Sequence, residues 1–267
     1  MATPGTTSPT VSGTGPTPVS HTRRRVLILG GTAEGRALAG LLSEAGYDPV
    51  TSLAGVTQSP SERAGETRSG GFGGVEGLCR YMAAERFDVL VDATHPFAVV
   101  ISNYAKEAAE RSGLPLLRLE RPAWAPEPAD RWVEVADNIA AVSAIPPAAR
   151  VLLTIGRKEV GPYFARSDIT GIARMIEAVD MEITANWQIH LARPPFSLDE
   201  ELRVLSDHSI SHLVTKNSGG QETHAKLVAA RMTGVAVIMI GRPLKPNVPT
   251  VADPLSALAF LDQSVSA

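Results

Sequence analysis

HLVTKNSGGQETHAKLVAARMTGVAVIMIG, residues 212–241, reads as a strand, a polar glycine loop, a helix and a second strand. The run 212–215 is mostly apolar and suits a buried strand, and the glycine pair 219–220 permits a tight turn. Because the start of a helix has free N–H groups and a positive dipole end, this loop predicts a site for phosphate or carboxylate. Lys216 adds a full positive charge. The alternative is an ordinary strand-to-helix turn that binds no ligand.

The same alternation of apolar runs and amphipathic stretches continues through most of the chain from Arg25 onward. The strand candidates are residues 26–30, 50–55, 88–94, 114–120, 151–156, 169–176, 187–193, 212–216 and 235–241. Residues 197–208 predict a helix, because Ser197 followed by Glu200 matches a capping box. Apolar strands that alternate with helices indicate parallel sheets that are covered on both faces.

The length of 267 residues and one proline-rich segment divide the chain into two predicted domains. Residues 121–131, RPAWAPEPADR, contain three prolines and no hydrophobic period, which is typical of a crossover between domains. We therefore predict an α/β fold with two Rossmann-like domains, residues 25–121 and 131–265, that have parallel sheets and a ligand cleft between them. Residues 1–24 are rich in Thr, Pro, Ser and Gly and predict a disordered tail.

The composition excludes several classes of protein. Hydrophobic residues make up 44% of the chain and charged residues 20%, as in a globular protein, and the net charge of -3 argues against nucleic-acid binding. One cysteine, Cys79, and six histidines without ligand spacing predict no metal site. A single cysteine fits a reducing compartment, and residues 1–24 contain no apolar stretch long enough for a signal peptide or a membrane span. We expect a cytoplasmic protein with no nucleic-acid or membrane partner.

The first predicted strand runs into a second glycine loop, GGTAEGR at 30–36. A dinucleotide fingerprint needs glycine at position 32, where threonine stands, so only the outer glycines of G-x-G-x-x-G match. The loop also lacks the lysine of a Walker A motif. Phosphate binding and a purely structural turn both stay open. The candidate cofactor residues in the two loops are Gly30, Gly31, Thr32, Glu34, Gly35, Arg36, Thr215, Lys216, Asn217, Ser218, Gly219 and Gly220.

The second predicted strand ends without the acidic residue that binds the ribose hydroxyls in NAD sites. Thr51, Ser52, Arg63 and Arg68 would tolerate a 2′-phosphate better than a bare ribose. This absence also counts against a site for S-adenosylmethionine.

His95 and several basic residues stand near predicted strand ends. The segment DATHPFA, 92–98, places His95 at the carboxyl end of a strand, beside the expected cleft, although a lone histidine is more often a structural hydrogen-bonding group. Single basic residues usually form surface ion pairs, yet several at such positions suit a ligand that carries several carboxylates. The candidate substrate-binding residues are His95, Arg118, Arg121, Arg157, Lys158 and Arg174.

Seven blocks, in order along the chain, resemble the precorrin-6A reductases of cobalamin biosynthesis, the precorrin-6x reductase family. The blocks are LGGTAEGR (29–36), GGFGG (70–74), DATHPFA (92–98), LRLERPAW (117–124), LLTIGRKE (152–159), ARMI (173–176) and LVTKNSGG (213–220) with AKLVAAR (225–231). The chain departs from the family pattern at ARPPF (192–196), where Pro194 replaces a glycine.

The resemblance implies an NADPH-dependent reduction of one carbon–carbon double bond in the precorrin-6A macrocycle, with neighbouring corrin-pathway enzymes as further partners. A nicotinamide carries the hydride, so the protein needs neither a metal nor an activated nucleophile. A proton must also be added, and His95, Lys216 or solvent are the candidate donors. Which glycine loop holds the cofactor phosphates stays open. The alternatives are the same reduction on a cobalt-containing macrocycle and a non-catalytic nucleotide- or tetrapyrrole-binding protein.

Overall fold

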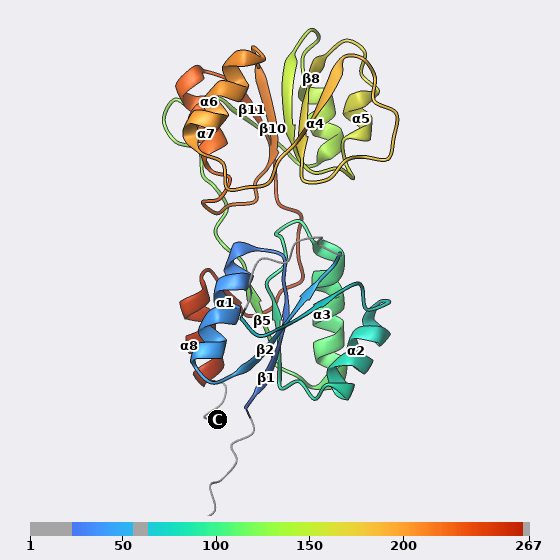
Figure 1. Cartoon of the computed structure of the whole chain (residues 1–267), viewed down its shortest axis with the longest axis vertical. Helices are drawn as coiled ribbons and strands as arrows, with labels where there is room; N and C mark the ends of the chain where they lie inside the picture. Colours follow the sequence, from blue (N-terminus) through green and yellow to red (C-terminus); the bar gives the residue numbers. More distant parts are fainter. Residues whose placement is uncertain (1–22, 56–63, 264–267) are drawn as a thin grey trace, which may run out of the picture.

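The computed structural model describes residues 23–55 and 64–263, which form two α/β domains, one above the other in Figure 1. Each domain contains a parallel sheet of six strands, so the predicted fold class is confirmed. The predicted tail, apart from residues 23 and 24, lies outside the described residues, and so does Arg63. In the described part of the chain, no helix is long and apolar enough to cross a membrane.

The first domain has the strand order β12-β5-β4-β1-β2-β3. Its strands are β1 (Arg25–Leu29), β2 (Asp48–Leu53), β3 (Glu66–Ser69), β4 (Val89–Asp92), β5 (Leu116–Leu119) and β12 (Thr250–Val251). Its helices are α1 (Ala33–Glu44), α2 (Val75–Ala84), α3 (Val99–Ser112) and α8 (Pro254–Gln263). Since side chains alternate along a strand, Val26 and Ile28 pack under α1 and α8, whereas Leu27 and Leu29 pack under α2 and α3.

The second domain repeats this arrangement with the strand order β6-β11-β10-β7-β8-β9. Its strands are β6 (Trp132–Val135), β7 (Arg150–Thr154), β8 (Thr170–Met175), β9 (Trp187–Leu191), β10 (His212–Lys216) and β11 (Ala236–Ile240). Its helices are α4 (Asn138–Ala144), α5 (Gly161–Phe164), α6 (Leu198–Asp207) and α7 (Ala225–Thr233). The cores beneath α4 and α5 and beneath α6 and α7 lie on opposite faces of the sheet. The predicted capping box of Ser197 and Glu200 begins α6.

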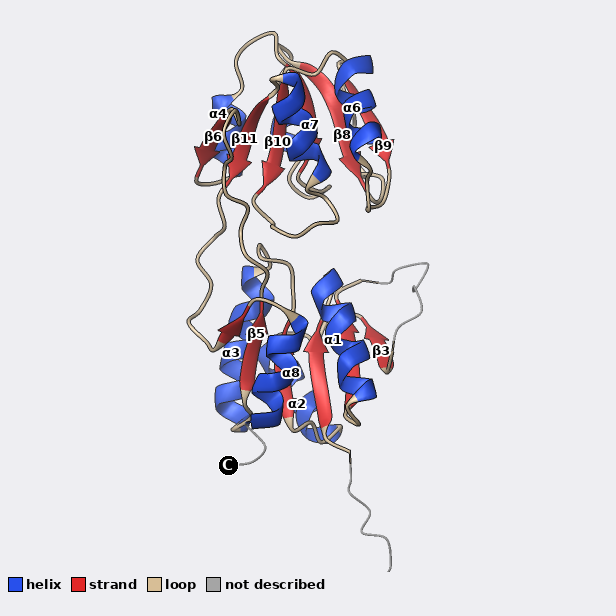
Figure 2. Cartoon of the chain, turned by 90° about the vertical axis from the view of Figure 1, so that its left-hand side faces the viewer, coloured by secondary structure: helices blue, strands red, loops and turns tan. Residues whose placement is uncertain are grey.

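The end of the chain differs from the expected domain of residues 131–265. Strand β12 pairs with β5, with Thr250 opposite Arg118, and α8 buries Ala257 and Leu261 in the core beneath α1. The chain therefore crosses between the domains twice, before β6 and after β11, as the two long loops in Figure 2 show. Helix α8 is apolar enough to need a partner surface, but its sequence does not say which of the two sheets provides that surface.

Candidate active site

The carboxyl ends of the strands in both domains face the space between them, as the arrowheads in Figure 2 show. Two cavities open there. The β1–β4 cavity has a volume of about 560 Å³ and is lined by the loops after β1, β2, β3 and β4, by the start of α3 and by Lys158 of the second domain. The interdomain cavity has a volume of about 400 Å³ and is lined by loops of both domains. Gly31 and His95 line both cavities, so the cavities meet at these two residues.

The first glycine loop brings the start of α1 to this meeting point. Thr32 caps α1, because its hydroxyl oxygen accepts a hydrogen bond from the Gly35 N–H group and donates one to the Ala93 carbonyl at 2.8 Å. Gly35 allows α1 to approach β4 closely, since a Cβ atom there would lie 3.2 Å from that of Ala93. Gly31 has a φ of +122°, and no atom lies within 4 Å of the position of an added Cβ. The backbone at Gly31 is thus open to a ligand.

Two charged residues of the same loop hold neighbouring segments instead of facing open space. Glu34 accepts a hydrogen bond from Arg121 at 2.6 Å, and Arg36 pairs with Glu222 of the second domain at 2.8 Å. These two predicted cofactor residues tie α1 to the crossover and to the second domain.

The second glycine loop, Thr215–Gly220, is packed against the crossover between the domains. The Asn217 side chain exchanges two hydrogen bonds with the backbone of Trp124. The Ser218 carbonyl accepts hydrogen bonds from Arg121 at 2.8 Å and from Arg242 at 3.2 Å. Other residues of the protein therefore occupy many of the polar groups of this predicted anion-binding loop. In addition, α7 does not begin directly after the loop but at Ala225.

Gly219 shows how close the packing at this loop is. An added Cβ atom there would lie 2.0 Å from the Pro122 carbonyl oxygen. Lys216 and Ser218 nevertheless line the interdomain cavity. Lys216 forms an ion pair with Glu159, and its ammonium lies 5.0 Å from the centre of the Phe97 ring.

His95 is a neutral imidazole at the junction of the two cavities. Its Nδ1 accepts a hydrogen bond from the Phe97 N–H group at 3.2 Å, so the proton of the neutral ring lies on Nε2. Burial, and then the positive charges of Arg121, Lys216 and Lys245, lower the pKa of His95 to about 3. At neutral pH its Nε2–H group can donate one hydrogen bond, but the ring holds no second proton to give away.

The lowered pKa of His95 predicts a pH-dependent contribution to stability. The unfolded chain protonates His95 near pH 6.5 but the folded chain does so only near pH 3, so this contribution is complete above pH 6.5 and declines as the pH falls toward 3. From pH 7.5 to pH 5 the wild-type protein should lose about 2 kcal/mol through His95 alone, at roughly 1.4 kcal/mol per pH unit below 6.5. Urea unfolding of the wild type and of His95→Gln at both pH values measures this. A stability difference between them that does not change with pH would contradict the assignment.

The predicted substrate-binding residues fall into two groups. Arg121 and Arg174 line the interdomain cavity, and Lys158 lines the β1–β4 cavity. Arg118 is buried, with its Nε atom 3.3 Å from Asp92, and Arg157 is half exposed in an ion pair with Glu177. Neither Arg118 nor Arg157 lines either cavity.

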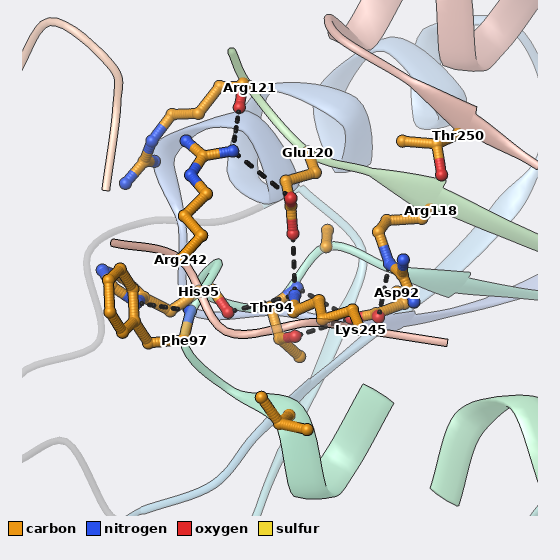
Figure 3. A network of polar contacts seen from close by, with 12 residues as sticks. Asp92, Thr94, His95, Phe97, Arg118, Glu120, Arg121, Arg242, Lys245 and Thr250 are labelled. Carbon is orange, nitrogen blue, oxygen red and sulfur yellow. Dashed lines mark hydrogen bonds and ion pairs between the residues drawn. The ribbon is translucent and has the colours of Figure 1, made fainter. Parts of the chain in front are cut away.

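A network of half-buried polar groups joins His95 to both crossovers (Figure 3). Lys245 donates hydrogen bonds to the His95 carbonyl at 3.2 Å and to Glu120 at 2.8 Å. Arg242 donates to Glu120 and to the Arg121 carbonyl. These contacts fix the backbone at the meeting point of the two cavities. Both crossover segments therefore contribute to its geometry.

Sequence reasoning missed Lys226, Phe196 and the backbone-fixing residues Arg242 and Lys245. Lys226 and Phe196 line the interdomain cavity. The available signal was the position of Lys226, three and four residues before Ala229 and Ala230 on the buried face of α7. A lysine on the apolar face of a helix marks a buried cation that needs an explanation.

The comparisons with known proteins agree with this architecture. The family model described as "Precorrin-6x reductase CbiJ/CobK" matches residues 25–262. The chain belongs to the precorrin-6x reductase family. It is 43% identical to the precorrin-6A reductase of Rhodococcus erythropolis, over 89% of this chain and 97% of that protein. It is 30% identical to the cobalt-precorrin-6A reductase of Priestia megaterium, over 82% of this chain and 90% of that protein.

A solved structure shows the same fold as this precorrin-6x reductase family member. The "CobK precorrin-6A reductase" superposes with a TM-score of 0.86 and 37% sequence identity, over 90% of this chain and 96% of that chain. The resemblance drawn from the seven sequence blocks is confirmed, and the protein is an oxidoreductase with a Rossmann-like fold of the cobalamin pathway.

Proposed function

We propose that this reductase uses NADPH to reduce one carbon–carbon double bond of metal-free precorrin-6A, giving the dihydro product. The observation that carries the proposal is the meeting of two different cavities at Gly31 and His95. One cavity is lined by glycines at the carboxyl edge of a parallel sheet, where nucleotides bind in this type of fold. The other is lined by Arg121 of the crossover and by cations of the second domain, and suits a ligand with several carboxylates.

The β1–β4 cavity fits a nicotinamide cofactor. The glycine-rich loop 70–74 forms one wall, and Cβ atoms added at Gly70, Gly71, Gly73 and Gly74 would meet nothing within 4 Å. Gly30 and Gly31, just before α1, form another part of the wall. Backbone N–H groups can approach a pyrophosphate closely where no side chain intervenes, and the dipole of α1 favours the negative charge. Between the two predicted glycine loops, the loop 30–36 is therefore the better phosphate cradle.

The end of β2 suits the 2′-phosphate of NADPH. Ser52 stands there in place of an acidic residue and lines the cavity. Arg68 of β3 donates a hydrogen bond to the Ser52 hydroxyl at 2.8 Å, and its guanidinium lies 4.1 Å from the centre of the Phe72 ring. A cation at this position would bind the additional phosphate, which NADH lacks.

We expect Arg68→Gln to raise the KM for NADPH by about 10- to 100-fold, because one charge-assisted contact of about 1.5 to 3 kcal/mol is lost. The KM for NADH should change little. Steady-state rates with both cofactors measure the ratio. Arg80→Gln, which alters an exposed arginine on α2, is the matched control. An equal loss with NADPH and NADH would remove Arg68 from recognition of the 2′-phosphate.

The interdomain cavity offers a macrocycle both charge and an apolar surface. Met175, Ile176 and Phe196 line it beside Arg121 and Lys216. The metal-free substrate is favoured over the cobalt form by sequence: identity is 43% to the Rhodococcus erythropolis protein and 30% to the Priestia megaterium protein.

In the proposed reaction the loops 30–36 and 70–74 would hold NADPH, which would supply a hydride to one carbon of the double bond. Lys216, at the end of β10, holds a proton on Nζ and donates it to the neighbouring carbon, so that both carbons become saturated. Glu159 orients the ammonium through their ion pair, and solvent restores the proton. His95 is held neutral by its low pKa, so it acts as a hydrogen-bond donor through Nε2 where the cavities meet.

The test is the absorbance of reduced nicotinamide when the purified protein is mixed with NADPH and enzymatically prepared precorrin-6A. We expect the band to decrease together with a change in the macrocycle spectrum, and more slowly with NADH. Decrease only with the cobalt-containing substrate would support the alternative substrate. Binding of both ligands without any decrease would support a non-catalytic binding protein.

A further inference from the structure

Glu120 is a half-buried carboxylate that lines neither cavity but joins the two crossovers between the domains. It directly follows β5, at the start of the first crossover, and its side chain is 17% exposed. One carboxylate oxygen pairs with Arg242 at 3.3 Å and the other with Lys245 at 2.8 Å, and both cations belong to the second crossover (Figure 3). Among the described residues, Glu120 is the only carboxylate that forms an ion pair with either cation.

The contact through Lys245 ends at the loop that both cavities share. The Lys245 ammonium donates a hydrogen bond to the His95 carbonyl at 3.2 Å. The same carbonyl accepts a hydrogen bond from the N–H group of Ala98, the residue that caps α3, at 2.8 Å. Because the Lys245 side chain is buried, water weakens its hydrogen bonds little. Lys245 therefore fixes the backbone of His95 relative to Glu120.

The contact through Arg242 ends in the second domain, directly after Lys216. The Arg242 guanidinium donates hydrogen bonds to the carbonyls of Asn217, at 2.8 Å, and Ser218, at 3.2 Å. Burial lowers the pKa of Arg242, and the negative charge of Glu120 acts in the opposite direction. Glu120 therefore stabilises the cation that holds the backbone next to Lys216.

We infer that Glu120 is a positioning residue for the reduction, because it sets the separation of His95 and Lys216 through its two cations. His95 stands where the proposed cofactor cavity meets the interdomain cavity, and Lys216 lines the interdomain cavity. Hydride and proton must reach neighbouring carbons, so these two loops must keep a fixed separation although they belong to different domains. This role rests on the proposed function, since it takes Lys216 as the proton donor, whereas the contacts of Glu120 do not depend on it.

The same crossover contains a second buried carboxylate, which serves as the matched control. Asp130 pairs with Arg231 of α7 at 2.8 Å, and its side chain is 1% exposed. Neither residue of this pair lines either cavity. Asp130→Asn therefore removes a buried charge from the crossover without touching the loops of His95 and Lys216.

The first experiment compares Glu120→Gln, which keeps the shape of the side chain but removes its charge, with the wild type. The kcat for precorrin-6A should fall about 10- to 100-fold, the usual effect of misplaced reacting groups, with the KM for NADPH and for precorrin-6A nearly unchanged. With NADPH deuterated at both C4 positions, single turnover by Glu120→Gln should show a primary isotope effect, because hydride transfer is the slowed step. Asp130→Asn should keep the wild-type kcat.

Double variants test whether Glu120 acts through its two cations. Lys245→Met and Arg242→Met each remove one of the two contacts. Combined with either substitution, Glu120→Gln should lower kcat by much less than the product of the two single losses, because residues of one network are not independent. If Glu120→Gln does not fold, Lys245→Arg and Arg242→Lys replace it. Each keeps the charge but changes the reach of the side chain, and each should lower kcat with little change in KM.

Amide hydrogen exchange tests the bridge without any ligand. In Glu120→Gln, exchange should become faster in peptides that cover residues 93–99 and in peptides that cover residues 215–220, because both loops lose a fixed contact. In Asp130→Asn, both sets of peptides should exchange as in the wild type. Faster exchange in only one of the two loops of Glu120→Gln would show that Glu120 does not join them.

The outcomes separate this role of Glu120 from the proposed function. A wild type that oxidises NADPH while Glu120→Gln keeps its kcat, or shows no isotope effect, overturns the positioning role and leaves the reductase proposal intact. Equal losses of kcat in Glu120→Gln and Asp130→Asn also overturn it, since general destabilisation then explains both. A wild type that oxidises no NADPH contradicts the reductase proposal and with it the positioning role, and hydrogen exchange then decides only whether Glu120 joins the two loops.

Discussion

Lys216→Met is expected to lower kcat for precorrin-6A by roughly 10²- to 10⁴-fold, the usual contribution of a positioned general acid. The substitution keeps the length of the side chain and its contact with Phe97 but removes the proton on Nζ and the ion pair with Glu159. Cofactor binding should be almost unchanged, because the β1–β4 cavity, which we propose for the cofactor, is lined by other residues. Single-turnover oxidation of NADPH and equilibrium binding of each ligand measure the two effects separately.

Two further variants test whether the loss of kcat is specific to Lys216. His95→Gln keeps a hydrogen-bond donor at the meeting point of the cavities, so its kcat should fall less than that of Lys216→Met. Lys106→Met, which alters a partly exposed lysine of α3 outside both cavities, should retain wild-type kcat. If Lys216→Met keeps its kcat and loses only substrate affinity, solvent supplies the proton and Lys216 is a binding residue.

Glu201→Gln should destabilise the protein by about 3 to 5 kcal/mol, which is the usual cost of removing one member of a buried ion pair. Glu201 has 0% exposure, and it is the carboxylate that pairs with the buried Arg174 beside Lys226. Without it, two buried cations face each other with no counterion. Urea unfolding at pH 7, followed by tryptophan fluorescence, measures the loss in the free energy of unfolding.

A matched exposed pair provides the control for Glu201→Gln. Glu76→Gln breaks the ion pair with Arg111, in which the glutamate side chain is 72% exposed, and should cost no more than about 1 kcal/mol. The double variant Arg174→Met with Glu201→Leu removes both buried charges and should recover most of the stability. If the double variant is as unstable as Glu201→Gln, lost packing and not an unpaired charge explains the effect.

The sequence predicted where the strands and loops of the site lie better than it predicted which residues contact one another there. Apolar runs located β1 and β10 closely, since a strand buried on both faces is a local signal. The exposed edge strand β3 has no such run and was missed. The loop 30–36 stands where predicted, at the end of β1, and its residues 33–36 form the first turn of α1. The proposed roles of these residues as ligands stay predictions.

The basic residues show why the contacts of the site could not be predicted from the sequence. Arg118 and Arg174 both stand at the ends of strands, and the sequence treats them alike. In the fold each meets a buried carboxylate from another element, Asp92 for Arg118 and Glu201 for Arg174. Lys226, on a helix that looked ordinary, forms an ion pair with no carboxylate in the described part of the chain. Whether a cation is free for a ligand depends on contacts between elements that lie far apart in the chain.

The sequence by itself determined the alternation of strands and helices, the glycine loops at strand ends and the family, because these depend on neighbouring residues and on motifs read in order. The tertiary structure alone decided three things. It placed β12 and α8 in the first domain, and it packed the crossover against the loop 217–220. It also joined the two cavities at Gly31 and His95. The physical reason is that hydrophobic periodicity acts over a few residues, whereas ion pairing, burial and cavity shape depend on how whole elements pack.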